Sequence, residues 1–211
     1  YGKKLSNNFR VASFLHDNRS QKTNSNFSLS DKTPLLGALL VWHKNLDGSG
    51  LRLKIGNSYQ KKNLQTTRQQ IGVSESAIGE TILRAESIFG EVRYDKRISD
   101  SFKLSPFIAI RTSNKTQQGY TETSANNPLS YNTINIESDT LLIGTHINKS
   151  LGDRFAINTV LGLEYDTSYN ASSIAPTGIN GLTTVNLESD YEDKRAVIAL
   201  GFDYDYDQEK K

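Results

Sequence analysis

The chain has 211 residues, of which 25 are Lys or Arg, 23 are Asp or Glu and 36% are hydrophobic. Its net charge of +2 comes from positive and negative residues that are interspersed along the chain. They form no extended basic region, so we expect no nucleic-acid partner. The absence of Cys excludes disulfides and zinc–thiolate sites. An apolar content this low suits the core of a soluble enzyme poorly, whereas a barrel with a polar interior needs no such core.

The first half of the chain alternates two-faced segments with turn sequences, which is typical of antiparallel strands. We predict strands over 9–16, 34–44, 51–60, 64–73 and 81–95. A polar loop is predicted at 17–32 and a glycine-bearing turn at 45–50. The longest apolar run, 35–42, is far too short for a transmembrane helix.

The second half continues the same pattern, with strands predicted over 102–112, 129–136, 140–149, 155–166 and 196–207. Polar loops are predicted at 113–127, with a short strand piece at 119–122, and at 167–190, and a tight turn at 150–153. In 154–166 alternate residues form an apolar face and a small, polar, partly acidic face. About ten such strands, joined by alternating long loops and short turns, predict an all-β fold, an antiparallel transmembrane β-barrel.

Aromatic residues recur near the strand ends, at the alternate positions that also carry the apolar side chains. Such rings favour the two membrane–water interfaces, so we expect an aromatic girdle. Aromatics are also favoured in strands generally, which leaves a purely structural interpretation open. The girdle candidates are Trp42, Tyr59, Tyr94, Tyr165 and Tyr204.

No pattern of catalytic or metal-binding residues emerges. The three histidines are isolated in sequence, and no Gly-x-Ser-x-Gly motif is present. Asp203, Asp205 and Asp207 follow strand spacing rather than the bent spacing of a calcium loop. We therefore expect no enzyme activity, no cofactor and no bound metal.

The alternate positions that carry polar side chains instead predict a water-filled lumen. Its charged and amide side chains would face inward, opposite apolar neighbours that face lipid. The predicted lumen-lining residues are Arg52, Lys54, Glu91, Arg93, His146, Asn158, Glu164, Asp203 and Asp205.

The order of several short pieces resembles a known family over roughly 35–207. These pieces are PFIAIR at 106–111, YTE at 120–122, Gly144 and GLEYD at 162–166. Together they are similar to the C-terminal translocator domain of bacterial autotransporters, which use type V secretion. The resemblance implies location in the bacterial outer membrane, insertion into its lipid by the barrel assembly machinery, and export of a covalently linked N-terminal passenger.

Two features depart from that family. Its barrel usually has about twelve strands and ends on a strand with a terminal aromatic, whereas this sequence ends in DQEKK. The family's helix between passenger and barrel is not evident either. We therefore expect a single barrel domain over 1–211, truncated at one or both ends and lacking about two strands.

Two other interpretations remain open at this point. A small outer-membrane adhesin or porin-like barrel would have no passenger and would bind partners through the loops 17–32, 113–127 and 167–190. A soluble ligand-binding β-barrel would place its apolar residues inside and stay in solution without detergent. The Gly-, Ala- and Ser-rich polar parity fits a crowded lumen better than a soluble surface.

Overall fold

A computed structural model describes residues 2–16, 27–29, 33–47, 49–70, 75–178 and 191–204. Strands dominate this part of the chain, which contains no helix long and apolar enough to cross a membrane. In chain order the strands are β1 (Gly2–Lys4), β2 (Phe9–His16), β3 (Phe27–Leu29), β4 (Leu35–His43), β5 (Gly50–Arg68), β6 (Ala77–Ser99), β7 (Phe102–Gln117), β8 (Tyr120–Thr121), β9 (Ser130–Tyr131), β10 (Ile134–Ser150), β11 (Phe155–Ala171) and β12 (Lys194–Tyr204).

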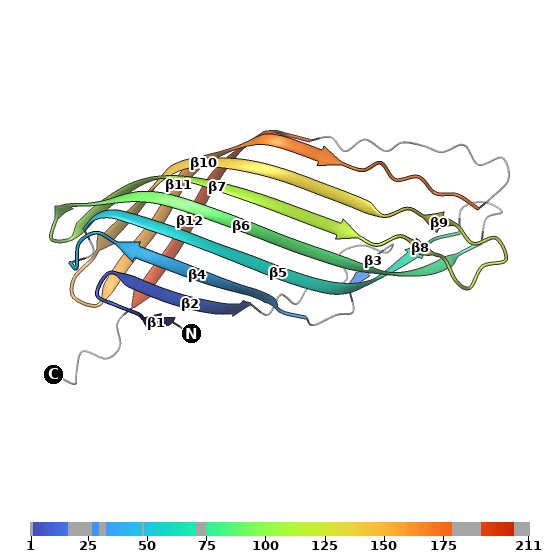
Figure 1. The fold of residues 1–211 in the computed structure, drawn as a ribbon, viewed down its shortest axis with the longest axis horizontal. Coiled ribbons are helices and arrows are strands. Elements are labelled where there is room, and N and C mark those ends of the chain that lie inside the picture. Colours follow the sequence, from blue (N-terminus) through green and yellow to red (C-terminus); the bar gives the residue numbers. More distant parts are fainter. Residues whose placement is uncertain are drawn as a thin grey trace.

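The strands form one large antiparallel sheet in the order β1-β2-β4-β5-β6-β7-β10-β11-β12, with β3 on β5 and a separate β8–β9 pair. The sheet curls strongly, so that β11 and β12 pass behind β4, β5 and β6 (Figure 1). A cavity of about 560 Å³ inside the curl is lined by side chains of strands from β4 to β12. Within the described ranges no pairing joins β12 to β1 or β2, so the sheet is open there. The predicted all-β antiparallel architecture is confirmed.

Several strands are longer than their alternation predicts. The predicted break at 61–63 lies inside β5, which pairs with β6 from Gly50↔Asp95 to Arg68↔Ala77. β10 likewise begins at Ile134 rather than at 140, and β11 continues to Ala171. We call the part of the sheet where the outward side chains are hydrophobic the apolar band. Beyond this band both faces of a strand contact water, so hydrophobic alternation disappears while backbone pairing continues.

The convex face of the sheet is apolar and exposed. Ile55, Leu163 and Ile198, for example, are 61%, 69% and 72% exposed. Among the described residues only three hydrophobic side chains are buried, namely Ala77, Phe107 and Leu129. A soluble ligand-binding barrel requires the opposite arrangement, and this face suits contact with lipid.

Glycines on the concave face are covered by aromatic rings from the neighbouring strand. Register pairs Phe14 with Gly37, Phe89 with Gly56, and Phe107 with Gly144. A Cβ built on Gly144 would lie 2.9 Å from the Phe107 ring, and one on Gly56 would lie 2.6 Å from the Phe89 ring. Each glycine thus provides the space that lets a large ring lie flat inside a strongly curved sheet.

The two ends of the sheet differ in their connections. Short turns at 44–49, 100–101 and 151–154 join strands at one end of the sheet, on the left in Figure 1. Longer segments at 17–34, 69–76, 118–133 and 172–193 connect strands at the other end. In outer-membrane barrels the short turns are periplasmic and the long loops are exterior.

Candidate functional site

The concave face holds a cluster of charged side chains centred on Asp95, which is only 2% exposed. Three cations from three strands surround its carboxylate: Arg52 Nε at 3.0 Å, Arg93 Nε at 3.3 Å and Lys103 Nζ at 3.6 Å. Because a buried carboxylate is costly unless it is paired, these three contacts hold the end of β6 against β5 and β7.

A second carboxylate, Glu91, extends this cluster along β6. Its Oε2 lies 2.7 Å from Lys54 Nζ, and its Oε1 lies 3.9 Å from an Arg93 nitrogen. The same Lys54 ammonium lies 5.4 Å from the centroid of the Phe89 ring. On β10, which pairs with β7, His146 packs against the Phe107 ring at 4.8 Å and lines a cavity of about 330 Å³ that also touches Arg52 and Asp95.

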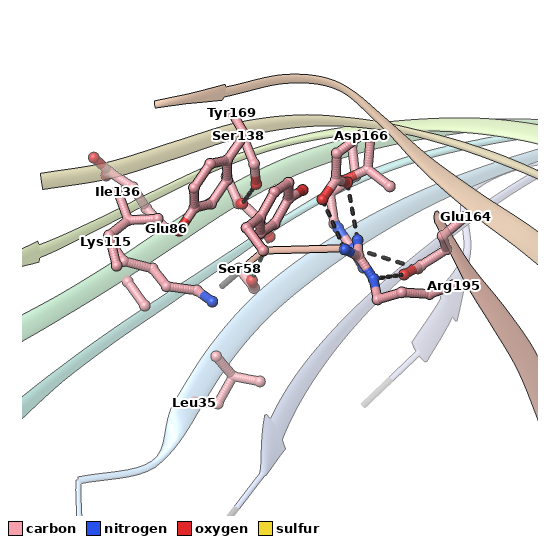
Figure 2. Close-up of a pocket in the computed structure, with 16 residues that line it drawn as sticks. Leu35, Ser58, Glu86, Lys115, Ile136, Ser138, Glu164, Asp166, Tyr169 and Arg195 are labelled. Atoms are coloured by element: carbon pink, nitrogen blue, oxygen red, sulfur yellow. Dashed lines mark hydrogen bonds and ion pairs between the residues drawn. The ribbon is translucent and has the colours of Figure 1, made fainter. Parts of the chain in front are cut away.

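A separate cluster lies around Arg195 on the last described strand. Its guanidinium reaches Asp166 at 2.8 Å and Glu164 at 3.3 Å, and Arg111 contacts the same Glu164 at 3.3 Å. Figure 2 shows Arg195 lying between the two carboxylates at one side of the large cavity. These pairs connect β7, β11 and β12 through side chains that face the interior of the curl.

Amides supply a third polar contact between strands. Asn148 donates to Asn158 Oδ1 at 2.6 Å, and Asn158 in turn donates to Asp203 Oδ2 at 2.5 Å. This chain of hydrogen bonds crosses β10, β11 and β12 near the end with short turns. A polar side chain on each of these strands therefore forms a hydrogen bond with the polar side chain on the next strand inside the curl.

The best-defined polar cluster outside the apolar band is centred on Glu122, which is 5% exposed. Arg68 binds this carboxylate with Nε at 2.9 Å from Oε1 and Nη2 at 2.9 Å from Oε2. The Leu129 amide donates to Oε2 at 2.9 Å, and the Tyr131 hydroxyl donates to Oε1 at 3.3 Å. The cluster fastens the segment around β8 and β9 to the end of β5.

This cluster shifts the pKa values of its members. Burial acts to raise the pKa of Glu122, but the hydrogen bonds from Arg68, Leu129 and Tyr131 outweigh it and hold that pKa below its usual value. Burial and the neighbouring Glu122 charge raise the pKa of Tyr131 to about 12. Glu122 is therefore ionised and Tyr131 neutral at pH 7.

The structure brings several of the predicted lumen residues into contact. Arg52, Lys54, Glu91 and Arg93 lie together, and Asn158 and Asp203 are joined by a hydrogen bond. Glu164 belongs to the Arg195 cluster, and Asp205 lies outside the described residues. The girdle candidates Tyr59, Tyr94, Tyr165 and Tyr204 are 41%, 54%, 43% and 63% exposed, whereas Trp42 is half-buried.

The predicted lumen-lining set left out the residues that complete these clusters, which are Asp95, Lys103, Arg111, Asp166 and Arg195. Asp166 already lies on the polar face predicted for 154–166, and Asp95 continues that alternation two residues after Arg93, so alternation could have added both. The pairing of Arg111 with Glu164 depends on the curl of the sheet, for which the sequence carries no local signal.

The described residues hold no group of three or more His, Asp or Glu side chains arranged to bind a metal ion. Their carboxylates contact arginines, lysines and amides, so the arrangement can solvate a polar interior and exclude lipid from it.

Comparison with protein families gives one match. A family model described as "Autotransporter beta-domain" matches residues 3–209, nearly the entire chain. No curated protein and no solved structure matches the chain.

Proposed function

Since the chain belongs to the autotransporter β-domain family, we propose that its charged concave face lines the lumen through which a linked passenger is exported. The family is the outer-membrane translocator domain of type V secretion, and this domain acts as a translocator rather than as a catalyst. The observation that carries the lumen proposal is the contrast between the two faces of one sheet. Buried ion pairs occupy the concave face, and aliphatic side chains up to 72% exposed occupy the convex face.

The paired charges suit this role for a physical reason. A lumen lined by unpaired charges would bind a passing polypeptide strongly, whereas charges paired to each other leave a wet but weakly binding wall. Asp95 is held by three cations, and both terminal nitrogens of Arg195 contact Asp166, so the charge of each carboxylate is largely neutralised locally. We propose that insertion by the barrel assembly machinery, contact with outer-membrane lipid and the aromatic girdle complete this function.

Single cysteines test which face is the lumen, because the natural chain has no thiol of its own. Lys54→Cys and Glu164→Cys probe the concave face, and Leu53→Cys and Leu163→Cys are the matched neighbours on the convex face. In intact vesicles a charged, membrane-impermeant thiol reagent should label the first pair at least roughly tenfold faster, since reactivity follows exposure to water. Faster labelling at Leu53 and Leu163 would reverse the assignment of the faces.

Passenger export is tested separately in cells. A reporter fused before the barrel should become sensitive to external protease, and depletion of the assembly machinery should abolish both this sensitivity and the membrane-inserted form. A reporter that stays protected while the barrel inserts normally would contradict the export role of this chain.

A further inference from the structure

Two cations lie side by side on the convex face, just beyond the apolar band. Register places Lys61 of β5 directly opposite Arg84 of β6, and both side chains are exposed. The neighbouring cross-strand pair on the same face, one step closer to the apolar band, is Tyr59 and Glu86. Lys61 follows the parity of Ile55 and Tyr59, so it points toward the surroundings of the barrel and away from the curl.

Neither of these two cations has an ionic partner within the described chain. Among the described residues neither Lys61 nor Arg84 forms an ion pair or hydrogen bond, whereas the inward cations Arg52, Lys54 and Arg93 all do. Like charges directly opposite each other across two strands are destabilising. An anion between the two side chains would relieve this repulsion.

The position of the pair indicates where that anion comes from. Lys61 and Arg84 lie on the side of the band that leads to the longer connection 69–76, which is the exterior side of an outer-membrane barrel. They stand two residues beyond Tyr59 and Glu86, at the level expected for lipid headgroups. A Lys or Arg at an anionic lipid surface contributes favourable electrostatic energy.

An apolar groove lies on the same convex face, nearer the middle of the membrane than the pair. It has a volume of about 340 Å³, its floor is at Gly90, and its walls include Ile55, Val92 and Ile110. Ile55 is six residues from Lys61 along β5, or about 20 Å, which a strand tilted by about 45° converts to ~14 Å of depth. One leaflet of a ~30 Å hydrocarbon core has about this depth, so the groove lies where an acyl chain ends.

We propose that Lys61 and Arg84 bind the phosphate of a phosphorylated lipid of the outer leaflet, with an acyl chain lying along Ile88 into the groove at Gly90. Glu86 limits the affinity by repelling the same phosphate from the adjacent outward position. The inference rests on the outer-membrane location of the domain and is independent of what passes through its lumen.

Native mass spectrometry of the whole chain, purified in detergent and titrated with bisphosphorylated lipid A, tests this site. The variant Lys61→Gln/Arg84→Gln should bind about 25-fold more weakly, since each cation contributes roughly fivefold. Glu86→Gln should bind several-fold more tightly. The matched control is Lys96→Gln/Arg154→Gln, which removes two exposed cations near the short turns and should bind like the natural chain.

Two further measurements separate the headgroup from the acyl chain. A Cβ at Gly90 meets only Ile110 Cγ1 at 3.9 Å, so this position can accept a side chain. Gly90→Leu places that side chain in the groove and should weaken binding several-fold with all charges intact. Dephosphorylated lipid A should bind weakly and equally to the natural chain and the double variant. Slower gel migration on boiling confirms that each variant is folded.

Three results would overturn the proposal. These are unchanged binding of lipid A by Lys61→Gln/Arg84→Gln, an equal loss in the control variant, or displacement of lipid A by millimolar inorganic phosphate. The last result would indicate a site for free phosphate, because a lipid held also by its acyl chain resists such competition.

Discussion

Glu122 is the residue whose contacts are most completely defined outside the apolar band. Replacing it with Gln removes the charge but keeps the size, and it leaves the Arg68 guanidinium without its carboxylate. We expect the segment around β8 and β9 to lose about 3 kcal/mol of local stability, as when one partner of a buried pair is removed. Hydrogen exchange of the Leu129 amide, which donates to Glu122, measures this opening directly.

A matched control for that variant is Glu137→Gln, which removes an exposed carboxylate from β10. It should leave the exchange of the Leu129 amide unchanged. Equal protection of this amide in the natural chain and in Glu122→Gln would show that the carboxylate does not hold the segment in place.

The same carboxylate makes the exterior segment sensitive to acid. The pKa of Glu122 is lower in the folded protein than in the unfolded chain, where it is about 4.3. Its contribution to stability is therefore complete above about pH 4.3 and is lost as the pH falls through the folded pKa. Exchange of the Leu129 amide, corrected for its intrinsic rate, should accelerate in that acid window, and in Glu122→Gln this acceleration should be absent.

At the scale of the strand, the glycine beneath each aromatic ring is a structural requirement. Gly144→Ala places a Cβ against the Leu161 carbonyl, 2.9 Å from both Gly162 Cα and the Phe107 ring. We expect it to destabilise the barrel by about 1–3 kcal/mol through overpacking. Gly201→Ala is the control, since its Cβ would meet nothing nearer than 3.8 Å. Urea unfolding in detergent compares the two midpoints, and similar midpoints would contradict this role of Gly144.

Strand positions could be predicted from alternation only where a strand crosses the apolar band. Leu51, Leu53 and Ile55 mark the band on β5, and the prediction was correct there. From 61 to 68 the strand leaves the band, and its pairing with β6 depends on backbone hydrogen bonds that any residue can form. The predicted break at 61–63 was wrong for this reason.

For the whole molecule, the exposed apolar face and the antiparallel ladder predict resistance to SDS. The protein in native membranes should migrate faster unboiled than boiled, because a closed barrel stays compact until heating breaks its ladder. Unchanged mobility on boiling would contradict a closed barrel in the membrane. Recovery of the protein in solution without detergent would contradict the membrane location itself.

The sequence by itself determined the fold class, the two chemically distinct faces and the family, because each depends on residue order along one strand. It assigned Glu91, Arg93 and Glu164 to the polar face from their parity alone. Only the tertiary structure decided which charges meet. Arg111 and Glu164 are 53 residues apart, and Arg68 and Glu122 are 54 apart. Those contacts follow from the curl of the sheet and from strand order, and both arise from packing of many strands together, which no local pattern encodes.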